Sequence, residues 1–257
     1  MAVFVVAPII LVFIYAFTTA DGTPTLSNFA MMGSFTTVFF RSFWLAFIAT
    51  LVCIILGYPI AYILAREGPR LQRLMVMLIM LPLWMNFLLR TYAWMSILEN
   101  TGLLNRLLYF LGLPQLRIIN TPTAVVLGMV YNFLPFMILP IYSVIVKINK
   151  SLFEAAQDLG ANSASVFLKL VIPLSLPGIL SGVTMVFVPA VSTFVITQLL
   201  GGGMVFLLGD LVEMQFLGTA YNPHLGSAIA IVMMAIVVGF VVIMNKFGAG
   251  EEKAVGL

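Results

Sequence analysis

The sequence predicts an all-α protein, a polytopic membrane helical bundle with six transmembrane helices. Of its 257 residues, 62% are hydrophobic and only 8% are charged, whereas a soluble globular domain carries about a quarter charged residues. The apolar residues form runs close to the ~20 residues that an α-helix needs to cross a bilayer. No alternation of apolar and polar residues marks barrel strands, so the spans are expected to be helices, which satisfy their own backbone groups in lipid.

Six apolar segments are predicted to cross the membrane. They cover residues 2–18, 42–65, 73–97, 122–146, 174–199 and 225–245. No basic residues precede the first segment, so a cleaved signal peptide is not expected. Two shorter apolar stretches, 103–113 and 204–217, are expected to be re-entrant or interfacial helices because they are too short to cross. Gly178 and Gly182, four residues apart in the fifth span, permit close packing of one helix on another.

The distribution of Lys and Arg predicts the orientation of the spans. One set of connections and ends holds Arg66, Arg70, Arg73, Lys147, Lys150, Lys169, Lys246 and Lys253. The opposite set holds only Arg41, Arg90, Arg106 and Arg117. Basic residues concentrate in cytoplasmic loops, so both termini and residues 151–170 are expected in the cytoplasm. The connections 19–41, 98–121 and 200–224 are then expected on the outer side.

The connection between the fourth and fifth spans is unusually polar for this chain. Ser151 and Glu154 fit a capping box that would begin a short helix, and Gly160 would end it in a left-handed conformation. A second short helix is expected to begin at Asn162 or Ser163 and to run to Pro173. Isolated helices of this length are unstable in water, so the apolar face must be buried. Two interpretations stay open here: a loop packed on its own bundle, or a docking element for another protein.

The residues of this connection resemble the cytoplasmic loop of type I ABC importer permeases. The motif consists of Glu154-Ala155-Ala156, Gly160, Ile172 and Leu176-Pro177. The resemblance implies a type I ABC importer permease fold, in which the short helix inserts into a cleft of a cytoplasmic ATPase and transmits its closure to the membrane helices. The ATPase-docking residues implied in this way are Glu154, Ala155, Ala156, Asp158, Leu159 and Gly160.

Four longer segments resemble the spermidine/putrescine permease family of PotB type. They are residues 56–66, 81–105, 130–145 and 207–216. The resemblance implies a permease subunit of an ATP-driven ABC importer, translocating spermidine and putrescine across the bacterial plasma (inner) membrane by alternating access. It also implies three kinds of protein partner: two copies of an ATPase subunit, a sister permease that completes a heterodimer, and an extracytoplasmic polyamine-binding protein.

The resemblance also suggests how the chain is divided. Residues 1–34 would hold the first transmembrane helix and an outer loop, and 35–246 the permease domain. The coupling loop of that domain would cover 147–173, and 247–257 would form a cytoplasmic tail.

The chain is not expected to be an enzyme or to carry a cofactor. No G-x-x-x-x-G-K-[ST] motif occurs in it, so ATP–Mg must be bound by a partner subunit. The single Cys53 and single His224 supply neither a disulfide, nor a metal cluster, nor a catalytic pair. The net charge of +3 is small and scattered, so nucleic acid is not an expected partner; membrane lipid is. An ion-coupled secondary carrier, one alternative, would usually embed acids within its spans, which lack them here. A permease for another small solute stays open.

Seven residues are candidates for the substrate pathway. A flexible polyammonium solute is best bound by carboxylates and aromatic faces, because cations are attracted to aromatic rings. The candidates are Trp84, Tyr92, Trp94, Glu99, Tyr131, Asp210 and Glu213. The aromatic members could instead form a belt at the membrane interface. Arg90, within the third span, is expected either to extend to the lipid interface or to pair with one of the three acids.

Overall fold

A computed structural model describes residues 2–158, 160–218 and 220–255. Within these ranges the regular structure is helical, apart from one isolated β-bridge between Thr18 and Pro24. Four helical segments are long and apolar enough to cross a membrane, and the pair α4 and α5 makes a fifth if it is one broken span. They are Ser27–Arg66, Pro122–Ile145, Ala164–Ser192 and Pro223–Phe247. The predicted polytopic helical bundle is therefore confirmed.

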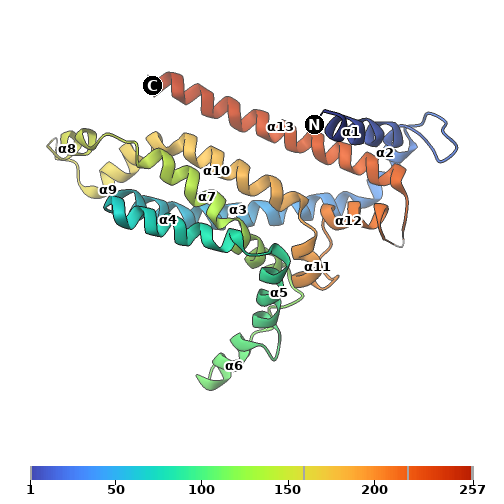
Figure 1. The fold of residues 1–257 in the computed structure, drawn as a ribbon, viewed down its shortest axis with the longest axis horizontal. Coiled ribbons are helices and arrows are strands. Elements are labelled where there is room, and N and C mark those ends of the chain that lie inside the picture. The colour runs from blue at the N-terminus through green and yellow to red at the C-terminus, as the bar shows by residue number, and fades with distance from the viewer. Residues whose placement is uncertain (1, 159, 219, 256–257) are drawn as a thin grey trace. The chain divides into compact units, whose positions relative to one another are not determined.

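The helices follow one another in the order shown in Figure 1. The longer ones are α1 (Ala2–Ala16), α3 (Thr36–Arg66), α4 (Pro69–Trp84), α5 (Phe87–Leu98), α7 (Pro122–Ile145), α10 (Ile172–Ser192) and α13 (Pro223–Val255). The shorter ones are α2 (Ser27–Met31), η1 (Met32–Phe35), α6 (Leu103–Phe110), α8 (Lys150–Asp158), α9 (Ser163–Val166), η2 (Phe167–Val171), α11 (Val195–Gly201) and α12 (Leu208–Phe216). α1 is apolar but has only 15 residues, so it is shorter than the other predicted spans.

The chain divides into two compact units. The first comprises Met1–Phe47, Leu88–Gly128 and Pro189–Phe240, and the second comprises Ile48–Phe87, Met129–Val188 and Val241–Leu257. In the first unit, Ser42 of α3 accepts a hydrogen bond from the Leu208 backbone at the start of α12 (2.8 Å). In the second unit, the Tyr58 hydroxyl of α3 lies 2.8 Å from Ser175 Oγ of α10. α3 therefore supplies a buried polar contact to each unit.

Close packing of α10 on α7 confirms the role predicted for the Gly178–Gly182 pair. A Cβ atom on Gly178 would lie 2.9 Å from the Pro140 carbonyl oxygen, and one on Gly182 would lie 2.8 Å from Met137 Sδ. Both distances are too short for a real side chain, so the two glycines let the helix backbones approach each other.

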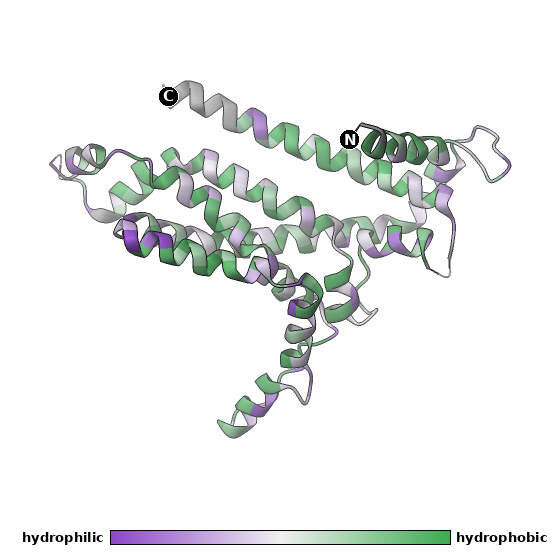
Figure 2. Cartoon of the chain, viewed as in Figure 1, coloured by the Kyte–Doolittle hydropathy of each residue, from purple (hydrophilic) through white to green (hydrophobic). Residues whose placement is uncertain are grey.

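Figure 2 shows that α10 and the described part of α13 are largely hydrophobic, whereas α8 and the start of α4 carry hydrophilic residues.

Two predicted spans are interrupted. The third, expected at 73–97, breaks after Trp84: Met85 is extended (φ −75°, ψ 147°) and α5 begins at Phe87. The fifth, expected to reach residue 199, ends at Ser192, and α11 begins at Val195. A Cβ on Gly209 of α12 would lie 2.5 Å from the Thr193 carbonyl oxygen. α12 therefore packs closely against the break between α10 and α11. Sequence hydropathy does not register such breaks, because the residues on both sides stay apolar.

Candidate functional site

The α8 helix begins with a cap that the sequence analysis missed. Asn149 Oδ1 accepts a hydrogen bond from the Ser151 backbone N–H (3.1 Å), and the Asn149 carbonyl accepts one from the Leu152 N–H (3.1 Å). Asn149 therefore satisfies the free donors at the start of the helix, as an N-cap residue does. The predicted capping box is wrong, since Ser151 is already inside α8. Asparagine is at least as good a cap as serine, and its position just before the helix was the available signal.

The end of α8 has the predicted geometry. Gly160 has φ +77°, a left-handed conformation that glycine adopts without steric cost. The Ala161 N–H closes the turn by donating to the Ala156 carbonyl (3.0 Å). Asn162 Oδ1 then accepts from the Ser165 N–H (2.7 Å) and caps the next helix, which confirms the predicted start of that helix.

The second short helix does not end at Pro173 as predicted. α9 passes into the π-helical segment η2 and on into α10, and the Ile172 N–H donates to the Phe167 carbonyl in the wider π pattern. Pro173, which has no N–H, follows this turn. The ordinary i→i−4 bonding is already interrupted there, so the proline is accommodated without ending the helix.

The predicted docking residues lie at the surface as far as they are described. Glu154, Asp158 and Gly160 are exposed, and Ala156 is half-buried. Leu159 lies outside the described residues, as does the side chain of Ala155. Leu152 on the same helix is 44% exposed. α8 thus presents an apolar side chain and two acids at its surface.

Asp210 is a buried carboxylate that holds α12 to α11. It is 4% exposed. Its Oδ1 accepts a hydrogen bond from the Thr197 hydroxyl (2.8 Å), and its Oδ2 accepts one from the Leu207 backbone N–H at the start of α12 (2.9 Å). Burial raises the pKa of Asp210 from 3.8 to about 6; the two hydrogen bonds oppose the rise and the nearby Glu213 carboxylate adds to it. Asp210 is thus both a structural tie and a group that titrates in the mildly acidic range.

Glu213 and Asp210 line one small cavity of about 160 Å³. Its other lining residues are Gln198, Gly203, Val205, Phe206 and Met214. Gln198 Nε2 donates to Glu213 Oε2 (3.2 Å), which links α11 to α12 a second time. Glu213 is only partly buried. It is therefore the carboxylate of the pair that is better placed to meet a cation.

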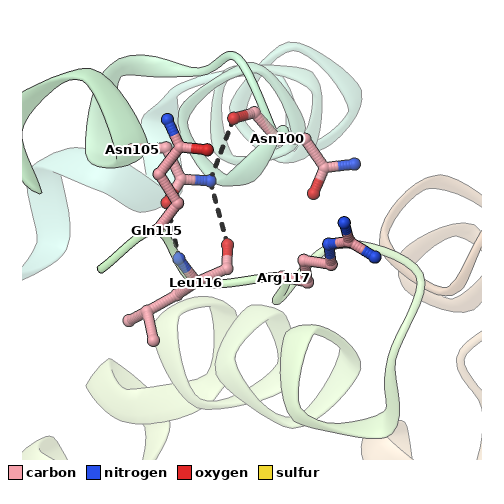
Figure 3. A pocket seen from close by; sticks show the side chains of 5 residues that line it. All are labelled: Asn100, Asn105, Gln115, Leu116 and Arg117. Atoms are coloured by element: carbon pink, nitrogen blue, oxygen red, sulfur yellow. Dashed lines mark hydrogen bonds between the residues drawn. The ribbon is translucent and has the colours of Figure 1, made fainter. Parts of the chain in front are cut away.

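Glu99 lies in a different part of the same unit. It borders a cavity of about 380 Å³ that is also lined by Ser96 and Arg106. A further cavity of about 370 Å³ is lined by Asn100, Asn105, Gln115, Leu116 and Arg117 (Figure 3). The third predicted acid is thus not a lining residue of the Asp210–Glu213 cavity.

Asn105 organises the segment that follows α5, and sequence reasoning missed it. It is 2% exposed. Its Nδ2 donates to the carbonyls of Glu99 (3.3 Å), Asn100 (3.1 Å) and Leu116 (2.9 Å), and its Oδ1 accepts from the Leu116 N–H (2.8 Å) (Figure 3). An asparagine within the largely apolar 103–113 stretch, where Arg106 is the other polar side chain apart from the Tyr109 hydroxyl, was the available signal for this role.

The aromatic candidates differ in exposure. Trp84 is 76% exposed and Tyr92 is 47% exposed, whereas Trp94 and Tyr131 are half-buried. High exposure of an aromatic residue in a membrane protein is typical of an interfacial belt. Arg90 is only 6% exposed, so its side chain does not extend into lipid.

The chain is similar to known transport proteins in sequence and in fold. Residues 54–245 match the family model described as binding-protein-dependent transport system inner membrane component. The spermidine/putrescine transport system permease protein PotB of Haemophilus influenzae is 38% identical over 248 residues, covering 91% of this chain and 86% of the relative. The protein of the same name from Escherichia coli is 40% identical over 209 residues, covering 80% and 75%.

Solved structures share the fold at low sequence identity. A chain of a bacterial ABC transporter that imports the acidic polysaccharide alginate has a TM-score of 0.81 at 15% identity, covering 96% of this chain and 90% of that one. A chain of the inward-facing MetNI methionine ABC transporter has a TM-score of 0.63 at 17% identity, covering 86% and 98%. At such identities the likeness concerns the fold of the chain.

Proposed function

Because the chain belongs to the family of binding-protein-dependent transport system inner membrane components, we propose that it carries spermidine and putrescine across the bacterial plasma membrane. Its role as a non-catalytic, multi-pass permease subunit of an ABC importer follows from the family itself. The cargo rests on one observation: 38–40% identity, over most of the chain, to permeases named for spermidine and putrescine.

The proposed assembly supplies what this chain lacks. A binding-protein-dependent system requires a binding protein; here we propose one that delivers polyamines on the outer side. A sister permease completes the pathway as a heterodimer, and two ATPase subunits bind ATP–Mg. Residues 35–246 form the permease domain, after the first helix and outer loop (1–34) and before a cytoplasmic tail (247–257). Both termini are in the cytoplasm in this proposal, in agreement with the Lys and Arg distribution.

The ATPase docks on α8 in this proposal. The contact residues are Glu154, Ala155, Ala156, Asp158, Leu159 and Gly160, within the coupling loop 147–173. Support comes from the fixed ends of α8, capped by Asn149 and Gly160, and from its exposed acids, which suit Arg or Lys of a partner. Caps of this kind stabilise the ends of a short helix, which favours its movement as one unit with the ATPase.

The cargo pathway is proposed to include the outer carboxylates and aromatic residues. Glu213 is the preferred ammonium ligand, since the Asp210 carboxylate already accepts two hydrogen bonds. Glu99, Trp84, Tyr92, Trp94 and Tyr131 complete the proposed set. Cation–π contacts with such rings contribute ~0.5–2 kcal/mol each.

Uptake by the reconstituted transporter tests this function. The permease pair, the ATPase and the binding protein are placed in proteoliposomes with internal ATP, and radiolabelled spermidine is supplied outside. We expect uptake that vanadate abolishes and that excess putrescine, but not methionine, competes away. Uptake of a different solute, with no response to spermidine or putrescine, would contradict the proposed cargo and leave the family assignment intact.

A further inference from the structure

Three side chains line one face at the C-terminal end of α3. Tyr58, Tyr62 and Arg66 follow one another at intervals of four residues, so they lie one above another along the helix. We call these three residues the α3 ladder. Tyr58 is buried, Tyr62 is half-buried and Arg66 is exposed, so the ladder leads from the interior of the second unit to its surface.

The outer end of the ladder contacts α8. The Arg66 guanidinium donates a hydrogen bond to the Tyr62 hydroxyl (2.8 Å) and lies 5.2 Å from the centroid of the Tyr62 ring. The same guanidinium lies 5.9 Å from the centroid of the Phe153 ring on α8, within cation–π range. Arg66 therefore connects α8 to α3.

The inner part of the ladder contacts the segment that leads into α10. The Phe167 ring stands edge-on to Tyr62 (5.0 Å between centroids, 78° between planes) and to Tyr58 (5.6 Å, 85°). Both arrangements are the edge-to-face geometry that aromatic pairs favour. Phe167 thus packs against two residues of the ladder, Tyr58 and Tyr62.

A buried hydrogen bond extends the ladder to α10 itself. Ser175 donates to the Ile172 carbonyl (3.1 Å), so its oxygen is free to accept from the Tyr58 hydroxyl at 2.8 Å. Phe167 is the first residue of the π-helical η2. A π segment interrupts the regular bonding of a helix and often marks a functional site. The contact chain therefore runs from Phe153 through the ladder and Phe167 to Ser175.

We propose that Phe167 and the α3 ladder are positioning residues that pass a displacement of α8 on to α3 and α10. This inference rests on the proposed docking of the ATPase on α8. When α8 moves, Arg66 must move with it or lose its contact with Phe153. Arg66 is bonded to Tyr62, which packs on Phe167, and packed groups switch between discrete arrangements rather than deforming continuously. The π turn at Phe167 is where α9 and α10 can rotate relative to each other.

Two spin labels in the assembled transporter test the link without reference to the cargo. One is attached at Leu152→Cys on α8 and the other at Met185→Cys on α10, both at exposed positions, in separate Cys53→Ala proteins. Their spectra are compared with and without ATP and vanadate. We expect both labels to respond in the parent protein. With Phe167→Ala, the Leu152 label should still respond and the response of the Met185 label should be lost.

The matched variant is Phe167→Tyr, which keeps the ring and should restore the response at Met185. Tyr58→Phe removes only the hydroxyl group that contacts Ser175 and should weaken the response of the Met185 label. If Phe167→Ala does not assemble with its partners, Tyr58→Phe tests the link in its place. An unchanged Met185 response in Phe167→Ala, or in Tyr58→Phe where the alanine variant does not assemble, overturns the link while docking stands. A silent Leu152 label in the parent protein rejects docking itself, and the inference with it.

Discussion

Asp210 uses one carboxylate to hold two helices. One oxygen fixes the first turn of α12 through the Leu207 N–H, and the other holds Thr197 of α11. Glu213, one turn further along α12, contacts the same neighbouring helix through Gln198. Ionisation of Asp210 in a buried position is costly, because the charged form loses its hydration. The residue therefore combines a structural role with an energetic cost that depends on pH.

The pH dependence of that cost has a defined sign. The pKa of Asp210 is raised from 3.8 to about 6 in the folded protein, so the folded state binds its proton more tightly than the unfolded chain does. The cost of ionisation is absent below pH ~4, grows as the pH rises through 4–6, and is complete above ~7. The free energy of unfolding should therefore fall with rising pH because of this residue.

The variant Asp210→Asn separates this effect from all other titrations. Between pH 5 and pH 7.5, the free energy of unfolding of the wild-type protein should fall by roughly 1 kcal/mol relative to that of the Asn variant, since one pKa unit corresponds to 1.36 kcal/mol. Thermal unfolding of both purified proteins at the two pH values measures the difference. Equal pH responses would show that the pKa of Asp210 is not raised in the folded protein, and a wild type that gains on the variant as the pH rises would show that it is lowered.

At the scale of elements, the ends of α8 determine whether it can act as a docking helix. Gly160 holds φ +77°, which proline cannot adopt because its ring fixes φ near −65°. Any change that forces this residue out of the left-handed region must unwind the last turn of α8 or redirect the chain toward α9. The docking surface would then lose its shape without loss of any contacting side chain.

Gly160→Pro should abolish co-purification of the ATPase with the permease while leaving membrane insertion intact. The matched control is Gly112→Pro, at another left-handed glycine (φ +71°), where an added Cβ would meet no atom within 4 Å. It lies on the segment after α6, outside the coupling loop, so the amount of bound ATPase should stay at the wild-type level. If Gly160→Pro binds as much ATPase as Gly112→Pro and the wild type do, α8 is not the docking element.

The contact between α7 and α10 gives a second element-scale prediction. Gly178→Ala would place a Cβ 2.9 Å from the backbone carbonyl of Pro140, and overpacking of this kind costs about 1–3 kcal/mol. Gly239→Ala in α13 meets no atom within 4 Å and should be neutral or stabilising by up to ~1 kcal/mol, since alanine favours a helix. Melting temperatures of the two variants that move in the same direction would contradict this packing account.

Local chemistry made part of these elements predictable. Gly160 and Asn162 follow rules that act within a few residues, so the end of α8 and the start of α9 could be inferred from the sequence. The start of α8 was misplaced because Asn149 and Ser151 are both capable caps, and only the structure shows which oxygen meets the free N–H groups. The breaks after Trp84 and Ser192 were missed because hydropathy stays high across them.

Contacts between distant segments could not be inferred in this way. Asp210 and Glu213 were predicted only as two of the candidates for the substrate pathway, and their partners Thr197 and Gln198 belong to another helix. The bond between Ser42 and Leu208 joins positions 166 residues apart. Such pairs depend on how helices pack, and neither spacing nor composition encodes that packing.

At the scale of the whole molecule, the chain provides a membrane pathway without an energy source of its own. It belongs to the family of membrane components of binding-protein-dependent transport systems and is the permease subunit of an ABC importer, so ATP acts through contact with an ATPase subunit. α8 is the proposed place of that contact, which requires the helix to face the cytoplasm. The connection 200–224, which carries Asp210 and Glu213, is then expected on the outer side of the membrane.

The most direct test of the account is the side of the membrane on which α8 lies. Ser151→Cys on α8 and Met204→Cys in the 200–224 connection, both at exposed positions, are prepared separately in a Cys53→Ala protein and treated with a membrane-impermeant maleimide. In intact spheroplasts the Met204 position should react and the Ser151 position should not; in inside-out vesicles the pattern should reverse. Labelling of Ser151→Cys from outside intact spheroplasts would contradict the account.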